Sequence, residues 1–169
     1  TVSPDGGSVY LAGPSTDAVT VFSRDAESGR LTFVESLRDG VGGVDGLDGV
    51  YHLVVSSDSK QVYVASRNDN ALATFSRDVN TGRLTPLQLF VDGVDGIGGL
   101  IGATEVAFSA DGQNVYVVSV FGSSMVVFDR SVDTGELSAV QTVPEAQCSD
   151  TTTISAVGRM FGLWYWNIP

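Results

Sequence analysis

An all-β propeller is the fold that this sequence predicts, and three observations carry the prediction. The first is an internal repeat with a fixed period of 53 residues. The second is that each unit holds short runs rich in Val, Tyr, Phe and Thr, separated by turn residues. The third is that no segment shows a sustained 3.6-residue apolar period, so almost no helix is expected.

The repeat is defined by matching segments at constant spacing. "VYLA" at Val9 returns as "VYVA" at Val62 and as "VYVV" at Val115. In each unit, "FSRD" or "FDRS" and then "SGRLT", "TGRLT" or "TGELS" follow at the same distances. A fixed period of this length is typical of propellers and solenoids. Residues 1–143 are therefore divided into three units, at about 1–38, 50–91 and 103–143.

Within one unit the pattern predicts four strands in order. In the second unit "HLVVS" is followed by the turn "SDSK", "QVYVAS" by the break "RNDN", and "ALATFSRD" by the turn "VNTGR" before "LTPLQLFV". The two middle strands are apolar on both faces, which requires cover on both sides. Four-stranded sheets stacked face to face around an axis provide that cover, so each unit is predicted to be a propeller blade.

Three blades are fewer than the four to eight that close a propeller. The first unit has only "TVS" left of its first strand, and the chain opens without Met or a signal peptide. We therefore expect either a partial chain or self-association through open blade faces. Residues 144–169 are expected to form a degenerate connector, with a further strand beginning at Ala156.

Composition excludes several classes of function. Twenty acidic residues against nine basic ones give a net charge of −11, which argues against a nucleic-acid binder and against adsorption to anionic membranes. No run of about 18 apolar residues is present, so no membrane span is expected. Cys148 is the single cysteine, which excludes an intrachain disulfide and a cysteine zinc cluster.

The segments "SADGQNVYVVS", "VFSRDAESGRLTFVES" and "RDGVGGVDGLDG" together resemble the lactonase-like propeller family, which includes six-phosphogluconolactonase-type enzymes and proteins with "YVTN"-like repeats. The resemblance covers about residues 1–143. It implies a ring of seven blades, of which about three are present. It also implies a lactonase, a carboxylic ester hydrolase, as one candidate activity, although propellers carry many unrelated functions.

A ligand site is expected on the face that carries "RNDN" and the glycine-rich connectors, near the mouth of the central channel. Lactone opening needs a base to activate water and a cation or donor for the oxyanion. His52 as base, Arg67 as electrophilic partner and Glu105, which takes the place of His52 one blade later, are the catalytic candidates. The same face also offers other polar candidates: Asp39, Asp45, Asp48, Asn68, Asp69, Asp92 and Asp95.

Two functions stay open at this point. The first is a scaffold that binds a protein or carbohydrate within a larger bacterial protein, and the alternative is hydrolysis of a small lactone. No cofactor is required by either, but calcium is an alternative at Asp39 and Asp92, the only aspartates that coincide between the two connectors. A periplasmic or secreted location is favoured, with the cytoplasm as the alternative.

Two repeated features are predicted to be structural. Glycine recurs at every third residue in both connectors, and an apolar residue follows it, as in Val41, Val44 and Leu47. This period predicts an extended or serially turned strap whose apolar residues pack inward. Arg24, Arg77 and Arg130 end the third strand of each unit, and we expect their guanidinium groups to bond backbone carbonyls at a nearby turn.

Overall fold

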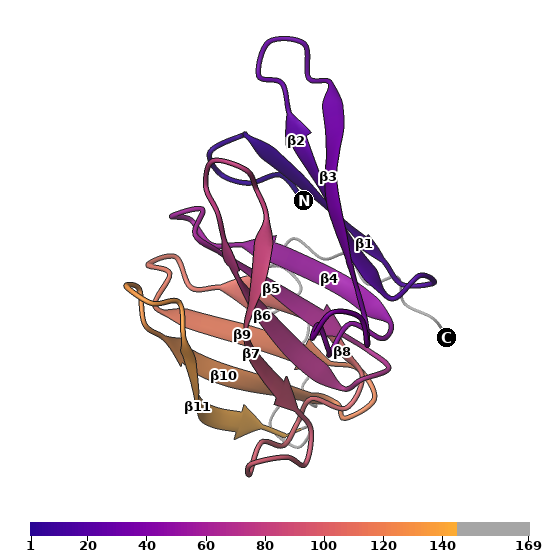
Figure 1. The fold of residues 1–169 in the computed structure, drawn as a ribbon. Coiled ribbons are helices and arrows are strands. Elements are labelled where there is room, and N and C mark those ends of the chain that lie inside the picture. Colours follow the sequence, from indigo (N-terminus) through magenta and orange to yellow (C-terminus); the bar gives the residue numbers. More distant parts are fainter. Residues whose placement is uncertain (145–169) are drawn as a thin grey trace, which may run out of the picture.

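The computed structural model describes residues 1–144, and every regular element in that range is a β-strand (Figure 1). The strands are β1 (Ser8–Gly13), β2 (Ala18–Arg24), β3 (Leu31–Arg38), β4 (Val50–Val55), β5 (Gln61–Ser66), β6 (Ala71–Arg77), β7 (Leu84–Val91), β8 (Ala103–Phe108), β9 (Asn114–Ser119), β10 (Ser124–Arg130) and β11 (Leu137–Val143). The all-β prediction is confirmed for these residues. The predicted connector and further strand within 145–169 lie outside the described range.

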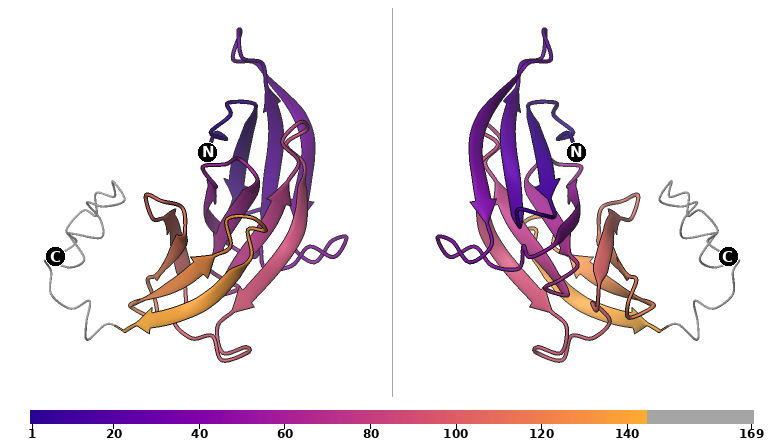
Figure 2. Two further views of the ribbon diagram at one scale, coloured as in Figure 1. Left: turned by 90° about the vertical axis from the view of Figure 1, so that its left-hand side faces the viewer. Right: turned by 90° about the vertical axis from the view of Figure 1, so that its right-hand side faces the viewer.

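The strands form three antiparallel sheets in sequence order, β1-β2-β3, β4-β5-β6-β7 and β8-β9-β10-β11. We call them blades 1, 2 and 3. Blade 1 has three strands, and a single bridge between Val2 and Val9 marks the place of its innermost strand. The three sheets follow one another side by side in the two views of Figure 2. This is the arrangement of consecutive propeller blades.

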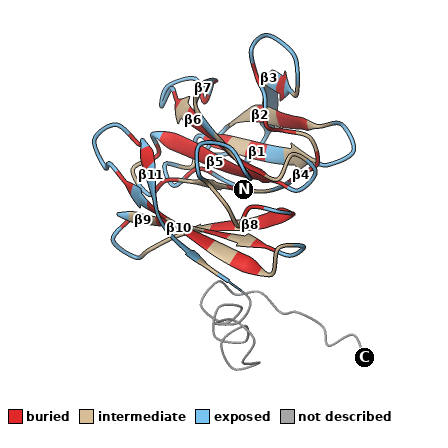
Figure 3. Ribbon diagram, turned by 90° about the horizontal axis from the view of Figure 1, so that it is seen from below, coloured by how far each residue is buried: buried red, intermediate tan, exposed pale blue. Residues whose placement is uncertain are grey.

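Apolar side chains fill the two spaces between neighbouring blades. One core cluster joins Tyr10, Val19 and Val21 of blade 1 to residues of blade 2 that include Val62 and Phe75. A second cluster joins the opposite face of blade 2 to blade 3. All six residues of β5 are buried, since this strand lies between two neighbours (Figure 3). The prediction that the middle strands need cover on both faces is thereby confirmed.

Residues 39–49 and 92–102, which we call straps, connect the outermost strand of one blade to the innermost strand of the next. They fold as consecutive turns with glycines at positive φ, so the serially turned alternative is the one observed. Leu47 and Leu100 are fully buried, but Val41 and Val94 are 59% and 50% exposed. The prediction of inward packing is wrong for these two valines, because both lie at the tips of the first turns.

The repeated aspartate of each strap holds the strap together. Asp39 Oδ1 accepts the N–H of Leu47 at 2.8 Å, and Asp92 Oδ1 accepts the N–H groups of Gly99 at 2.7 Å and Leu100 at 2.8 Å. These bonds satisfy backbone donors that the turns leave unpaired. The coincidence of the two aspartates therefore has a structural explanation.

The arginines at the ends of the third strands of blades 2 and 3 each join their own blade to the preceding one. Arg77 donates to Ser59 O at 2.8 Å within blade 2, and also to Tyr10 Oη at 2.7 Å and Asp5 Oδ2 at 2.7 Å in blade 1. The Arg77 side chain is fully buried, whereas Asp5 is 35% exposed. The predicted bond to a turn carbonyl is confirmed, and the bonds to the preceding blade are new.

The same set of contacts recurs one blade later. Arg130 donates to Gly112 O at 3.2 Å within blade 3, to Tyr63 Oη at 2.9 Å and to Asp58 Oδ2 at 3.0 Å in blade 2. We call this Arg–Tyr–Asp group the staple. Burial alone would raise the pKa of Asp58, but hydrogen bonds and the guanidinium charge outweigh it and lower that pKa.

Candidate functional site

His52 and Glu105 come together on the innermost strands of blades 2 and 3. His52 Nδ1 lies 3.2 Å from Glu105 Oε2, and the two side chains are 39% and 16% exposed. The backbone N–H of Val106 also points at His52 Nδ1, at 3.3 Å. The imidazole is therefore oriented by two groups of the neighbouring blade while part of its surface stays accessible.

A β-bulge aims each of these side chains. The pairing of β4 with β5 shifts register between Val50 and His52, and that of β8 with β9 shifts between Ala103 and Glu105. A bulge leaves one residue unpaired and re-aims the next side chain. Because the register shifts at the same position in both blades, His52 and Glu105 occupy equivalent positions on the innermost strands of neighbouring blades.

The environment of the pair changes the pKa of the Glu105 carboxyl group. Burial raises the pKa of Glu105, and the nearby His52 opposes that rise. Such a pair holds the imidazole in one orientation and leaves Nε2 for chemistry.

A cavity of about 190 Å³ adjoins the pair. Besides His52 and Glu105, it is lined by Val54, Val106, Ala107, Tyr116 and Val118. The apolar lining was not predicted, because these residues belong to ordinary strand patterns. A larger hollow of about 670 Å³ lies at the opposite ends of the blade 3 strands. Its lining is mostly polar and holds no histidine, so the smaller cavity is the better candidate for catalysis.

Arg67 is not joined to the pair. Its guanidinium lies over the ring of Phe121, 5.1 Å from the centroid, in the turn between β9 and β10. Its backbone N–H bonds Gly49 O at 3.0 Å, where the strap enters β4. Arg67 therefore connects the strand ends of blades 2 and 3 through a cation–π contact.

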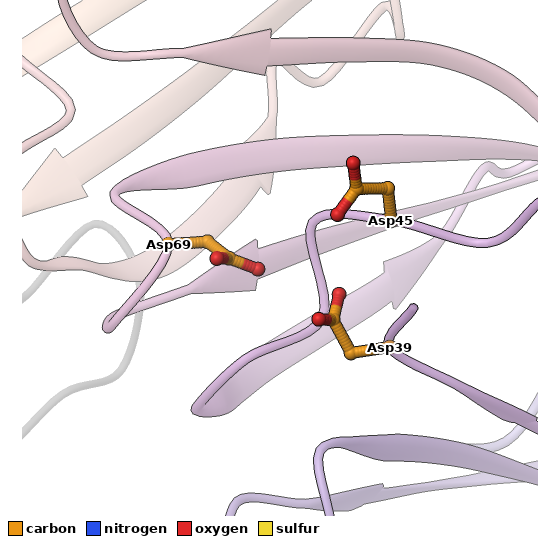
Figure 4. Close-up of side chains that lie close together, drawn as sticks. All are labelled: Asp39, Asp45 and Asp69. Atoms are coloured by element: carbon orange, nitrogen blue, oxygen red, sulfur yellow. The ribbon is translucent and has the colours of Figure 1, made fainter. Parts of the chain in front are cut away.

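Three of the predicted acidic residues form a cluster where the first strap meets the β5–β6 turn. One carboxylate oxygen from each of Asp39, Asp45 and Asp69 lies within 4.8 Å of the others (Figure 4). Burial, together with the charges of its acidic neighbours, raises the pKa of Asp69. Asp69 Oδ2 accepts the N–H of Asp48 at 2.8 Å, so the cluster is tied into the strap.

The remaining polar candidates are spread along the same end of the blades. Asn68 donates to Asp48 Oδ1 at 2.9 Å. Asp92 bonds its own strap and is not a member of the acidic cluster, and Asp95 lies in a turn with φ of 50°. Calcium binding at Asp39 and Asp92 stays a prediction.

No helix in residues 1–144 has the length and hydropathy that a membrane crossing requires. No curated protein matches the sequence at a significant level. Solved structures with the same fold include the periplasmic gluconolactonase of Pseudomonas aeruginosa, with 29% identity and a TM-score of 0.71 over 85% of this chain and 38% of that one.

Two further solved structures have the same blade arrangement. A candidate 6-phosphogluconolactonase from Bacteroides uniformis has 22% identity and a TM-score of 0.71, over 85% of this chain and 39% of that one. A protein from Lactobacillus plantarum has 24% identity and a TM-score of 0.72, over 86% and 41%. At these identities the likeness shows the fold alone. The chain spans about two fifths of the length of these three proteins.

The sequence profile described as "Lactonase, 7-bladed beta-propeller" matches residues 44–149, which is more than half of the chain. The match covers both complete blades and the first strap from Val44 onward. The fold, the 53-residue repeat and this match agree with the resemblance in the sequence. The chain therefore belongs to the lactonase family of seven-bladed β-propellers, of which residues 1–144 form three blades.

Proposed function

We propose that the protein hydrolyses a small lactone, with His52 as the general base. The observation that carries the proposal is the contact between His52 Nδ1 and Glu105 Oε2 at the edge of an apolar cavity. The family match and the periplasmic gluconolactonase with the same fold support this class of reaction.

The chemistry uses the two nitrogens of one imidazole. The step uses the tautomer in which Nδ1 carries the ring proton and donates it to the Glu105 carboxylate instead of accepting the Val106 N–H. In that tautomer His52 Nε2 takes a proton from water as the water oxygen attacks the lactone carbonyl. The tetrahedral intermediate then collapses, the ring C–O bond breaks, and the proton on His52 passes to the leaving alkoxide to give the hydroxy acid. Glu105 orients the ring and stabilises its cationic form through Nδ1.

The apolar wall of the cavity fits the hydrocarbon part of a lactone ring. Val54, Ala107 and Val118 contribute no charge, and the net charge of −11 disfavours polyanionic substrates. Neutral lactones such as δ-valerolactone and δ-gluconolactone are therefore the first substrates to test.

The test compares hydrolysis rates of the full chain and its variants, followed by base uptake at constant pH. His52→Gln should lower kcat/KM by about 100-fold or more, since a positioned base contributes roughly 10²–10⁴-fold. Glu105→Gln should lower it by about 10-fold by loosening the ring. Glu136→Gln, an exposed carboxylate on blade 3, is the control and should leave the rate unchanged. Equal rates for His52→Gln and wild type would remove His52 from the mechanism.

A non-catalytic scaffold is the second candidate. The observation in its favour is that Arg67 stacks on Phe121, so this cation is not joined to His52. On this proposal the cavity binds a carbohydrate or protein side chain without turnover. Titration calorimetry with tetrahydropyran, a cyclic ether that cannot be hydrolysed, together with the rate assay distinguishes the two: binding with no wild-type turnover favours the scaffold.

A location outside the cytoplasm belongs to the same proposal. It is supported by the periplasmic relative with the same fold. Fractionation of cells that express the gene from its own start codon would test it, and recovery of the protein only with cytoplasmic markers would contradict it.

A further inference from the structure

The dipeptide Asp–Gly occurs at seven places in this chain, and one of them differs from the others in its backbone contact. In a flexible peptide this dipeptide is prone to form a cyclic imide, because glycine has no side chain to shield its nitrogen from the preceding carboxyl group. In a folded protein the reaction also requires that the fold hold the nitrogen close to the carboxyl carbon. The seven places must therefore be compared by what the fold does with each glycine nitrogen.

At five of the seven places the glycine N–H donates to an oxygen of a residue other than the preceding aspartate. The bonds are Gly6 to Ser3 O at 2.8 Å, Gly40 to Val44 O at 2.9 Å, Gly93 to Ile97 O at 2.7 Å, Gly112 to Ser109 O at 2.9 Å and Gly49 to Asp17 Oδ1 at 2.9 Å. At the sixth place, Asp95–Gly96, the glycine N–H has no acceptor within residues 1–144. At none of these six does the nitrogen contact the carboxyl group that it would attack.

Asp45–Gly46, in the first strap, has that contact. The N–H of Gly46 donates to Oδ1 of Asp45 itself at 3.0 Å. Because Oδ1 is bonded to the carboxyl carbon, the contact holds the nitrogen beside the atom that it would attack. Asp45 is exposed and its carboxyl group is open to water, whereas Gly46 is buried. The fold therefore fixes the nucleophile and leaves the leaving group solvated.

The second strap shows a different arrangement at the same position. There Gly98 takes the place of Asp45, and the N–H of Gly99, the counterpart of Gly46, donates to Asp92 Oδ1 at 2.7 Å. In the first strap Asp39 Oδ1 accepts the N–H of Leu47 at 2.8 Å, but that of Gly46 goes to Asp45. Asp45 has thus replaced the strap aspartate as the acceptor for this one nitrogen.

The fold also requires glycine at position 46. Its φ is 82°, which disfavours any residue with a side chain. A Cβ at this position would overlap Leu89 Cδ1 and would lie 3.5 Å from Ala73 Cβ, because the strap packs closely on blade 2 here. Packing therefore demands the residue that leaves the nitrogen least shielded.

We propose that Asp45–Gly46 converts spontaneously to isoaspartate through a cyclic imide. The Gly46 nitrogen gives up its proton and forms a bond to Asp45 Cγ, and the carboxyl hydroxyl leaves as water with that proton. Water then attacks the former backbone carbonyl of Asp45, which breaks the bond from this carbon to Gly46 N. The chain stays linked through Cγ, and no other reactant is needed. The proposal does not depend on lactone hydrolysis.

The product would alter the first strap at its anchor. The backbone from Asp45 to Gly46 becomes longer by one methylene group, and the free carboxylate moves to the former backbone carbon. Carboxylate oxygens of Asp39, Asp45 and Asp69 lie within 4.8 Å of one another, so the acidic cluster changes its arrangement (Figure 4). The bond between Leu47 and Asp39 begins one residue after the longer link. Conversion should therefore loosen the strap where it is tied to blade 2.

The test is peptide mapping of the full chain after parallel incubation in the folded state and in concentrated guanidinium chloride. Electron-transfer fragmentation identifies isoaspartate at each place. In the folded chain it should form at Asp45 at least about 10-fold faster than at Asp39, Asp48 or Asp92, since a misplaced reacting group can cost about 100-fold in rate. In guanidinium chloride the hydrogen bonds are lost, and the rates at the different places should become similar.

A pair of matched variants separates geometry from sequence. Asp45→Asn keeps the contact with Gly46 N and loses ammonia in the same attack, so the folded variant should convert faster than the wild type. Asp48→Asn creates the same dipeptide where Asp17 holds Gly49 N, and it should convert at least about 10-fold more slowly than Asp45→Asn. Circular dichroism checks that both variants are folded.

Two results would overturn the proposal. One is isoaspartate spread evenly over the seven places in the folded chain. The other is a folded chain in which Asp45 stays unconverted while the same residue converts in guanidinium chloride. Equal rates for the two folded asparagine variants would show that the contact of Gly46 N has no effect, and would overturn it as well.

Discussion

Replacing Arg77 by methionine tests whether the staple stabilises the propeller. Methionine keeps most of the apolar stem and removes the guanidinium. The change breaks the bonds to Tyr10 Oη, Asp5 and Ser59 O, all at 2.7–2.8 Å, around a side chain with no exposed surface. Ser59 O and the Tyr10 hydroxyl then lose a donor in a buried setting, which is more costly than losing a surface contact.

The expected loss follows from the burial of the two partners. Removing one member of a buried ion pair costs roughly 3–5 kcal/mol. Asp5 is 35% exposed and regains water, so the lower end, about 3 kcal/mol, applies. For a chain of this size each kcal/mol corresponds to roughly 2–4 °C, so Tm should fall by about 6–12 °C.

The control is Arg83→Met. Arg83 donates to Glu35 Oε2 at the same 2.7 Å, but its side chain is 59% exposed. Such a surface pair contributes about 0–1 kcal/mol. Both variants are measured by urea titration followed by circular dichroism. A loss below about 1 kcal/mol for Arg77→Met, equal to that of Arg83→Met, would refute the view that burial gives the staple its strength.

Three further results are expected. The pKa of Asp58 is lowered in the folded state, so the ionised carboxylate stabilises the fold above about pH 4, and this stabilisation is lost as the pH falls through the folded pKa. In the variant Asp58→Asn the urea concentration at the unfolding midpoint should therefore depend less on pH between pH 3 and 7 than it does in the wild type. Gly82→Ala places a Cβ 2.4 Å from Ser8 Oγ at the junction of blades 1 and 2, so it should lower Tm more than Gly93→Ala, which has the same φ of 77° and open space. Burial raises the pKa of Glu105 above its ordinary value of 4.5, so the folded state holds this proton more tightly than the unfolded state does. The free energy of unfolding should therefore decline as the pH rises from 4.5 through the folded pKa, and Glu105→Gln should remove this decline.

The sequence predicts the blades well because their determinants are local and repeated. Turn residues and alternating apolar runs recur at fixed spacing, so strand limits follow from any one unit. The burial of the middle strands is also predictable from the sequence, since "QVYVAS" is apolar on both faces. The arginine of each unit was also predicted to be structural, and it is.

What the sequence did not predict depends on contacts between units. The staple joins residues 67 and 72 positions apart, and the period alone does not say which blade faces which turn. The recurrence of Asp5, Asp58 and Asp111 was the available signal. The contact of Arg67 with Phe121 is not predictable from the repeat, because Phe121 is an aromatic residue at a turn where the other units have Ser15 and Asn68.

The position of the staple arginine has a consequence for synthesis on the ribosome. The hydroxyl of the staple tyrosine in one blade cannot form its hydrogen bond until the arginine 67 residues later, at the end of the third strand of the next blade, has been synthesised. At roughly 5–20 residues per second, that arginine is made about 3–13 s later. During this interval an apolar blade face is open to water and to other nascent chains. The exposed acidic residues of this chain, whose net charge is −11, slow aggregation during this interval, because like charges repel neighbouring nascent chains until the next blade covers the apolar face.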